Sequence, residues 1–323
     1  MLSLRTCLSA LAVLGLASAA HATDTLKFAH VYETATPYHE AALRAAEEFK
    51  QRTDGRYEIK VYPASSLGKE VAINEGLALG TVDIIYTGVG FAGSAYGPLS
   101  ISDYPFTLRG FDHWKAYKDS DLFKTLSAGY TEKTGAEIFA LTYYGARHVT
   151  ANKPILTPED MQGLKIRVPN APSYVMFPKQ VGANPTPMAF SEVYLALQQG
   201  VVDAQENPLP TIKFKRFYEV QTNINLTGHI TNSLITVVSG KRLKKMDAAD
   251  IEILKEVLAS SADWASEQIR QSEQELVEWF RSEGITVNEV DREPFMAAVK
   301  PALVGEDVPW SPDVYEQLQQ IGQ

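Results

Sequence analysis

Apolar and polar positions along the first half of the chain predict strands and helices in alternation. Ala41, Ala45 and Phe49 fall on one face of the first expected helix, and Gly80 ends the second. This order is typical of a largely parallel sheet with helical crossovers. The expected elements are strands over residues 25–30, 57–62 and 82–86 and helices over 37–51 and 69–79.

A second series of the same kind follows turns rich in glycine and proline over 88–105. With about 300 residues to place, two series indicate an α/β protein with either two lobes or one large domain. The expected strands cover 136–144, 148–152, 164–168 and 232–239, and the expected helices cover 114–130, 173–181 and 191–199.

One long helix is predicted from Asp247, as its N-cap, to Glu283. At 1.5 Å per residue it would be about 54 Å long, so it has to lie along both lobes. The predicted lobes are 23–144 plus 232–271 and 145–231 plus 272–323, with crossings near Gly145, Thr231 and Gln271. The apolar positions of this helix are Ile251, Leu254, Leu258, Ala262, Ala265, Ile269, Leu276 and Phe280.

The first 22 residues have the pattern of a secretory signal peptide. A short basic start over 1–5 precedes an apolar run over 8–19, and Ala20-His21-Ala22 is an A-x-A cleavage site. We therefore expect export to the periplasm, with a mature start near Thr23. No later apolar run approaches the ~18 residues of a membrane span, so no span is expected in the mature chain.

Composition narrows the possible partners and cofactors. The formal net charge is −9, and loss of Arg5 with the leader leaves 29 basic and 39 acidic side chains, a charge of −10. This balance argues against nucleic acid as a partner but allows a small anion held by local arginines. Cys7, the one cysteine, lies in the leader, so no disulfide or cysteine-bound metal is expected.

Sequence motifs give little support to an enzyme, a metal site or any cofactor. Gly88 to Gly93 matches G-x-G-x-x-G, but it follows the third strand and no clear helix start comes after it. We expect instead a loop whose backbone passes close to another lobe or to a ligand. His30 ends the first strand at the edge where α/β sheets bind ligands, although a histidine bonded to loop backbone is an equal alternative.

Two arginines and an asparagine are the candidates for binding a carboxylate. Alternation over 164–168 leaves Arg167 on the face opposite the apolar residues, and Pro169 ends the strand there. Arg147 follows Gly145 at a predicted lobe crossing, and Asn207 is held extended by Pro208. Guanidinium groups on short strands suit a carboxylate. The alternatives are surface ion pairs, or a general acid formed by the nearby pair Asp203 and Glu206.

Several longer motifs resemble the substrate-binding proteins of TRAP transporters, the DctP family, over essentially the whole mature chain. The resemblance implies a two-lobed periplasmic binding protein fold with a hinge cleft, and delivery of a small organic acid to the small and large membrane permease subunits. The motifs are DYPFTLRG, YYGARHVTANKPI, GLKIRVPNAPSY, VGANPTPMAFSEVYLALQQGVVDAQENPLP and FYEV.

The resemblance also implies roles for single residues. Arg167 corresponds to the arginine that holds the substrate carboxylate, Arg147 to a second arginine, and Asn207 to the amide that completes the clamp. Asn170 and Phe190 match positions that line the cleft in the sialic-acid-binding branch. Glu70 falls where that branch has an acidic residue that binds hydroxyl groups.

One departure from the sialic-acid branch bears on the ligand. Gly88 and Phe91 stand where that branch has an acid and an arginine, so the long polar tail of sialic acid would lose partners. We therefore expect a monocarboxylate sugar acid such as a hexuronate, bound without catalysis as the lobes close. Sialic acid, a shorter hydroxy acid, a C4 dicarboxylate and a periplasmic ligand sensor are the alternatives. A C4 dicarboxylate would make poor use of Glu70.

Overall fold

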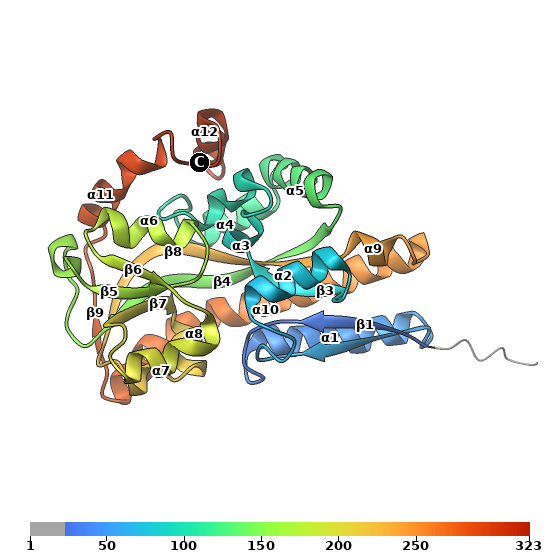
Figure 1. Ribbon diagram of the computed structural model, residues 1–323, viewed down its shortest axis with the longest axis horizontal. Coiled ribbons are helices and arrows are strands. Elements are labelled where there is room, and N and C mark those ends of the chain that lie inside the picture. The colour runs from blue at the N-terminus through green and yellow to red at the C-terminus, as the bar shows by residue number, and fades with distance from the viewer. Residues whose placement is uncertain (1–22) are drawn as a thin grey trace, which may run out of the picture.

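The computed structural model describes residues 23–323, so the predicted signal peptide over 1–22 lies outside the described residues. Helices cover both sides of a central sheet (Figure 1). Helices α1, α8 and α10 lie on one side, and α4, α5 and α6 lie on the other. The architecture is therefore mixed α/β, as the sequence predicted.

The sheet is one continuous structure in the order β2-β1-β3-β8-β4-β7-β5-β6, with β9 paired to β8. Its outer parts are parallel, but β3–β8, β8–β4 and β4–β7 are antiparallel. The expectation of a largely parallel sheet thus holds only on either side of the centre. The strands are β1 (Asp24–Ala29), β2 (Tyr57–Tyr62), β3 (Ile84–Gly88), β4 (Glu137–Ala151), β5 (Lys165–Val168), β6 (Asn184–Pro187), β7 (Ala204–Pro208), β8 (Asn223–Val238) and β9 (Thr286–Asn288).

The two central strands are longer than predicted. The sequence predicted separate strands over 136–144 and 148–152, whereas β4 runs through both, and β8 begins nine residues before the predicted position 232. Gly145 adopts φ +116, and the β4–β8 register shifts between Tyr143 and Gly145 and again between Arg147 and Val149. Such bulges absorb an extra residue without ending a strand, which is why the interruption in the pattern was misleading.

The predicted helices are present, and two places in the first half of the chain need correction. The expected helix over 114–130 is two helices, because Ser120 accepts a hydrogen bond from the Phe123 amide and caps a new helix. A four-residue helix, α3, begins at Val89, where the sequence predicted turns. The first helices are α1 (Pro37–Arg52), α2 (Glu70–Leu79), α3 (Val89–Ala92), α4 (Phe111–Lys118), α5 (Asp121–Thr134) and α6 (Ser173–Gln180).

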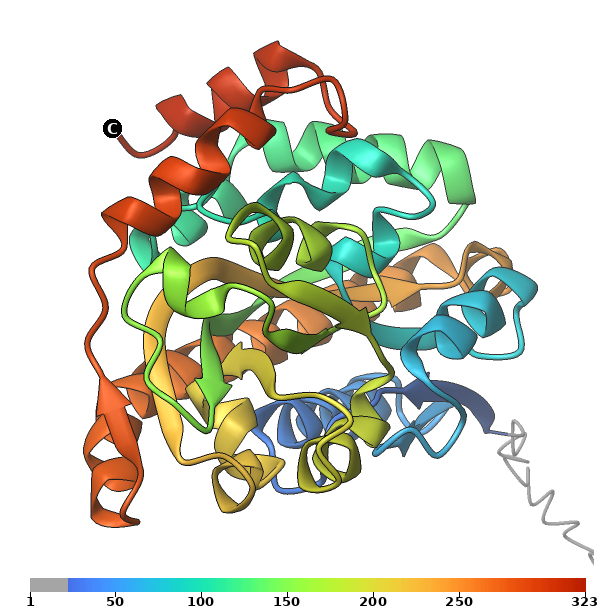
Figure 2. The same cartoon turned by 60° about the vertical axis from the view of Figure 1, so that its left-hand side comes forward.

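The later helices include the long helix of the chain. They are α7 (Val193–Gln198), α8 (Leu209–Phe214), α9 (Gly240–Leu243), α10 (Ala248–Ser282), α11 (Glu293–Leu303) and α12 (Pro312–Gln320). Short 3-10 helices add η1 (Gly97–Asp103), η2 (Pro158–Met161), η3 (Phe190–Glu192) and η4 (Phe217–Glu219). Figure 2 shows the C-terminal helices near α4 and α5, where Arg109 donates to the Gln319 and Ile321 carbonyls.

Helix α10 is unbroken over 35 residues, about 52 Å, as predicted. Asp247 occupies its N-cap position, but its side chain makes no capping hydrogen bond. Leu254 and Ile269 pack into the larger hydrophobic core, while Leu276 and Phe280 pack into a second core with α7 and α8. Helix α10 therefore contributes side chains to both hydrophobic cores.

The sheet joins two units that we define by their elements. The β1–β3 unit comprises residues 24–92, and the β5–β7 unit comprises residues 165–219. Strands β4 and β8 pass between them. The lobe boundaries at 144/145, 231/232 and 271/272 stay predictions. Within residues 23–323, no helix is both long and apolar enough to cross a membrane.

Candidate ligand-binding site

A cavity lies between the two units, beside the central strands. Its deep part has a volume of about 30 Å³, and an adjoining outer chamber has a volume of about 500 Å³. Glu70, Phe91, Arg167 and Phe190 line both parts. The deep part is also lined by Val31, Tyr32, Gly88, Tyr144, Arg147, Pro169, Tyr174, Asn207, Asn232 and Leu234.

Arg167 reaches the cavity from β5, just before Pro169 ends that strand. Its side chain is almost fully buried. Nε and Nη2 donate to the Met188 carbonyl at 3.0 and 2.7 Å, whereas Nη1 has no hydrogen-bond partner among residues 23–323. Burial without a bonded carboxylate lowers the pKa of Arg167 to about 10. This guanidinium therefore has donors free for an anion.

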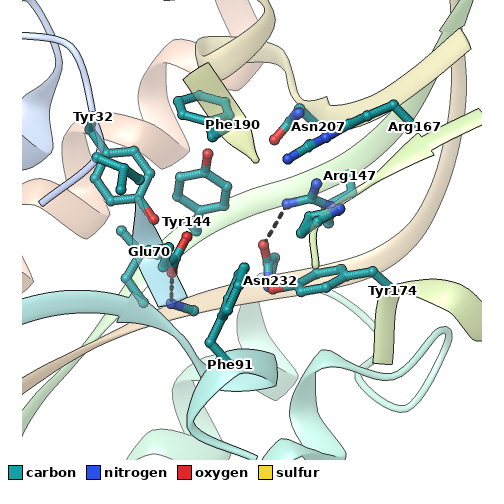
Figure 3. A pocket seen from close by; sticks show the side chains of 14 residues that line it. Tyr32, Glu70, Phe91, Tyr144, Arg147, Arg167, Tyr174, Phe190, Asn207 and Asn232 are labelled. Carbon is teal, nitrogen blue, oxygen red and sulfur yellow. Dashed lines mark hydrogen bonds between the residues drawn. The ribbon is translucent and has the colours of Figure 1, made fainter. Parts of the chain in front are cut away.

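Arg147 reaches the same cavity from β4, but its bonds are mostly used within the protein (Figure 3). Nε and Nη2 bind the Glu206 carboxylate, Nη2 also donates to the Glu206 carbonyl at 2.6 Å, and Nη1 donates to Asn232 Oδ1 at 2.8 Å. Its guanidinium carbon lies 4.9 Å from the centre of the Tyr174 ring. Since a guanidinium has five N–H groups, one on Nη1 is left for a ligand.

Glu206 is the partner of Arg147 and makes a poor general acid. Burial alone would raise the pKa of Glu206, but Arg147 and His229 hold it below its ordinary value. His229 Nε2 lies 3.2 Å from Glu206 Oε2, and the His229 ring stacks on Phe177. The carboxylate therefore stays ionised inside a bonded network, and the general-acid alternative finds no support.

Asn207 lies beside Arg167 on the cavity wall, at the end of β7 (Figure 3). Its Nδ2 donates to Gln205 Oε1 at 2.6 Å, which fixes the orientation of the amide. That is its one side-chain hydrogen bond within the described part of the chain. The remaining amide N–H and the amide oxygen are available to a carboxylate or a hydroxyl group.

Glu70 lies across the cavity from the two arginines, at the start of α2 (Figure 3). Its Oε1 accepts hydrogen bonds from the Gly88 amide at 2.7 Å and from Thr87 Oγ1 at 3.0 Å. Burial nonetheless raises the pKa of Glu70 to about 7. Its second carboxyl oxygen is suited to accept from a ligand hydroxyl.

The other predicted site residues lie at different depths. Phe190 lines both parts of the cavity, and Asn170 lines the outer chamber alone. His30 does not line either part: Nε2 lies 3.1 Å from His39 Nδ1, and Nδ1 accepts from the Tyr32 amide at 3.2 Å. It supports the backbone behind Tyr32, which is the loop-bonded alternative stated above.

Four residues with polar side chains that line the deep part were not predicted as site residues: Tyr32, Tyr144, Tyr174 and Asn232. Asn232 could have been found from the sequence, because it is a polar residue at the start of the apolar strand predicted over 232–239. In the structure it orients Arg147. Tyr32 lies in the loop after β1 and Tyr174 at the start of α6, where periodicity gives no signal, whereas Tyr144 lies within β4. The structure also explains why residue 90 is a glycine: a Cβ there would lie 2.3 Å from Ser173 Oγ of the β5–β7 unit. The expected close approach of the glycine-rich segment to another lobe is therefore present.

The chain is similar in sequence to a known protein family and to a curated relative. Residues 28–305 match the family model DctP, described as bacterial extracellular solute-binding protein, family 7. The sialic acid-binding periplasmic protein SiaP of Vibrio cholerae is 36% identical over 292 residues, which cover 90% of this chain and 91% of SiaP.

Three solved TRAP periplasmic solute-binding proteins are similar throughout. One from Bordetella bronchispeptica, with density interpreted as pantoate, has a TM-score of 0.89 at 32% identity, covering 93% of this chain and 100% of its own. One from Roseobacter denitrificans, with bound L-galactonate, has a TM-score of 0.87 at 31% identity; the match covers 94% of this chain and 100% of that one. One from Citrobacter koseri, with bound D-glucuronate, has a TM-score of 0.87 at 26% identity; the match covers 93% of this chain and 100% of that one.

These matches identify the class of protein. TRAP solute-binding proteins are periplasmic, bind small organic acids and work with membrane permease components; they are substrate-binding proteins and not enzymes. The match covers most of the chain, and the two-lobed architecture agrees with that of the solved structures. The chain therefore belongs to the bacterial extracellular solute-binding proteins of family 7, the DctP family of TRAP solute-binding proteins.

Proposed function

We propose that this protein captures a monocarboxylate sugar acid, with a hexuronate such as glucuronate or galacturonate as the expected ligand, in the periplasm. It then delivers that ligand to the small and large permease subunits. One observation carries the proposal. Arg167 is buried at the cavity, holds a positive charge without a bonded carboxylate, and keeps Nη1 free within the described residues.

The carboxylate binds at the deep end of the cavity. Arg167 supplies charged donors, and Arg147 and Asn207 each have a donor left over. Charge-assisted hydrogen bonds contribute roughly 1.5–3 kcal/mol each. Three such bonds supply most of the roughly 8 kcal/mol that a micromolar Kd requires.

The hydroxyl-bearing part of the ligand lies toward Glu70 and the outer chamber. The deep part is the smaller, at about 30 Å³, so the remaining carbons extend into the 500 Å³ chamber. Phe190 offers an apolar wall there, and Asn170 offers an amide at the rim. A six-carbon acid is long enough to place its carboxylate at the arginines and its hydroxyl groups near Glu70 and in the outer chamber. A four-carbon dicarboxylate would place its second charge near Glu70.

Gly88 and Phe91 support a ligand shorter than sialic acid. Both residues line the deep part; Gly88 has no side chain, and the Phe91 ring offers neither a charge nor a hydrogen bond. A long polar tail passing them would lose its water without gaining partners. The L-galactonate and D-glucuronate held by two of the similar structures are six-carbon sugar acids, which supports the same size class.

Thermal unfolding in the presence of a ligand panel tests the proposal. The panel contains D-glucuronate, D-galacturonate, L-galactonate, pantoate, sialic acid and succinate. A ligand present at 100 times its Kd stabilises the folded state by about 2.7 kcal/mol, so true ligands raise the unfolding midpoint clearly. We expect the hexuronates to give the largest shifts. Shifts for none of these acids would refute sugar-acid capture, and the largest shift with sialic acid or succinate would refute the size argument.

A further inference from the structure

Two ion pairs join the β1–β3 unit to the β5–β7 unit across the cleft. Lys69, which precedes α2, has its Nζ 2.5 Å from Glu192 Oε1 in η3. Glu33, in the loop after β1, has its Oε1 2.7 Å from Lys215 Nζ, just past the end of α8. Each pair therefore links segments more than 100 residues apart in the chain.

Both pairs are attached to walls of the ligand cavity. Lys69 and Glu192 themselves line the outer chamber. Glu33 directly follows Tyr32, which lines the deep part, and the Lys215 ammonium lies 5.1 Å from the centre of the Phe190 ring. Phe190 lines both parts of the cavity. Forming the pairs therefore fixes side chains that a ligand would touch.

The two pairs have opposite polarity. The β1–β3 unit contributes the cation of one pair, Lys69, and the anion of the other, Glu33. If the units slid so that a partner met the wrong group, Lys69 would approach Lys215 or Glu33 would approach Glu192. Repulsion between like charges disfavours such a shift, so the arrangement selects one docking register.

We propose that Lys69–Glu192 and Glu33–Lys215 are positioning residues that latch the two units over the bound ligand and set their register. This inference rests on the proposed function, because it assumes that a ligand occupies the cleft and that the units separate to release it. The pairs act on residence time: they form as the units meet and must break before the ligand leaves.

The two pairs differ in expected strength. The side chains of Lys69 and Glu192 are 56% and 49% exposed, whereas those of Lys215 and Glu33 are 16% and 35% exposed. Exposed pairs are weakened by water and salt, and buried ones less so. Glu33–Lys215 is therefore the stronger latch, supported by the contact of Lys215 with the Phe190 ring.

Charge reversal followed by charge exchange tests the latch. The single variants are Lys215→Glu and Lys69→Glu, and the exchanged variants add Glu33→Lys to the first and Glu192→Lys to the second. The dissociation rate is measured by stopped-flow fluorescence with whichever of D-glucuronate, D-galacturonate or L-galactonate the wild type binds most tightly. We expect release to be on the order of tenfold faster for Lys215→Glu and about threefold faster for Lys69→Glu. The Lys69/Glu192 exchange should return release to within about twofold of wild type, whereas the Lys215/Glu33 exchange should recover most of the loss but not the contribution of the Lys215 contact with the Phe190 ring.

Arg281→Glu is the matched control, because Arg281 pairs with Glu278 at 2.5 Å and with Glu289 at 3.5 Å and lines neither part of the cavity. Its release rate should equal that of wild type. Wild-type release rates in both reversed variants, or exchanged variants no better than the single ones, would overturn the latch while leaving sugar-acid binding intact. Failure of the wild type to bind any of the three acids would instead overturn the proposed function, and the latch with it.

Discussion

Two buried arginines at the same cavity differ in their neighbours. Arg147 has a carboxylate, a carbonyl and an amide as partners, while Arg167 has one carbonyl. Both are about 2% exposed, so burial does not separate them. Although burial opposes it, Glu206 raises the pKa of Arg147, whereas burial lowers that of Arg167 to about 10. One arginine is neutralised by the fold, and the other needs a counter-ion from outside.

Glu206 and Glu70 differ from each other in the same way as Arg147 and Arg167. Glu206 is bonded to Arg147, and its pKa is lowered even though burial acts to raise it. Glu70 faces the cavity shared with Arg167, and burial raises its pKa to about 7. A charge that belongs to the scaffold is thus paired, while charges kept for a ligand stay apart from each other. The bonded partners of a buried charge, more than its position, therefore show whether the charge stabilises the fold or is available to a ligand.

Arg147→Ala should give the largest effect. Removing it leaves Glu206 buried without a counter-charge, which costs about 3–5 kcal/mol of the free energy of unfolding. Urea denaturation without ligand measures this loss, and binding falls with it because the cavity wall is disturbed. The paired replacement Arg147→Met with Glu206→Leu should recover most of the stability but not the binding. A single variant as stable as wild type would mean that the ion pair does not support the fold.

Arg167→Ala should have the opposite profile. Ligand-free stability should stay the same or rise, because a charge without a bonded carboxylate is removed from the interior. Ligand affinity should fall by about 3–5 kcal/mol, since the ligand carboxylate would be buried unpaired. Isothermal titration calorimetry measures the affinity. Arg167→Lys should not restore it, because lysine lacks the planar fork. Unchanged affinity in the alanine variant would remove Arg167 from the site.

Glu70→Gln tests the contrast between the glutamates through pH. Because the pKa of Glu70 rises from 4.5 to about 7 on folding, its stabilising contribution is full below about pH 4.5 and is lost as the pH rises through 7. The Glu70 contribution should therefore fall across this window, so that, after allowance for partial exposure, the stability of wild type relative to the variant should drop by about 1–2 kcal/mol. Glu273, whose pKa burial also raises to about 7, leaves some dependence in both proteins.

Urea denaturation at several pH values between 4 and 8 provides the measurement. Glu206 gives the opposite sign, because a lowered pKa contributes stability that is lost as the pH falls. Identical slopes for wild type and Glu70→Gln would mean that Glu70 is solvated like a surface carboxylate. Such a result would remove it from the buried cavity wall.

The sequence was sufficient where the signal was local. The apolar spacing of α10 from Leu254 to Phe280 predicted its full length, and Pro169 at the end of a strand placed Arg167 at the cavity. The resemblance added Asn170 and Phe190, which do line the cavity. Periodicity and strand ends are properties of neighbouring residues, so they can be read before the fold is known.

The partners of Arg147 could not be read in that way. Glu206 faces Arg147 because β4 and β7 pair antiparallel, with Val149 opposite Glu206, and a bulge between Arg147 and Val149 shifts the register of β4 against β8. Asn232 reaches Arg147 from β8, 85 residues away in sequence. Such contacts depend on register across long strands. Chemistry could be predicted for each residue, but its partner could not.

Tyr174→Phe should give the smallest effect, and it tests whether the Arg147 side of the cavity also contacts the ligand. The Tyr174 hydroxyl donates to Asp103 Oδ2 at 2.8 Å and accepts from Asn232 Nδ2 at 3.3 Å. Asp103 keeps its bond from the Gly90 amide, so the loss should be about 1 kcal/mol in urea denaturation. Affinity should change less than threefold, because the ring still packs on Arg147. A tenfold loss of affinity in calorimetry would show that this hydroxyl touches the ligand, and that the Arg147 side also takes part in recognition.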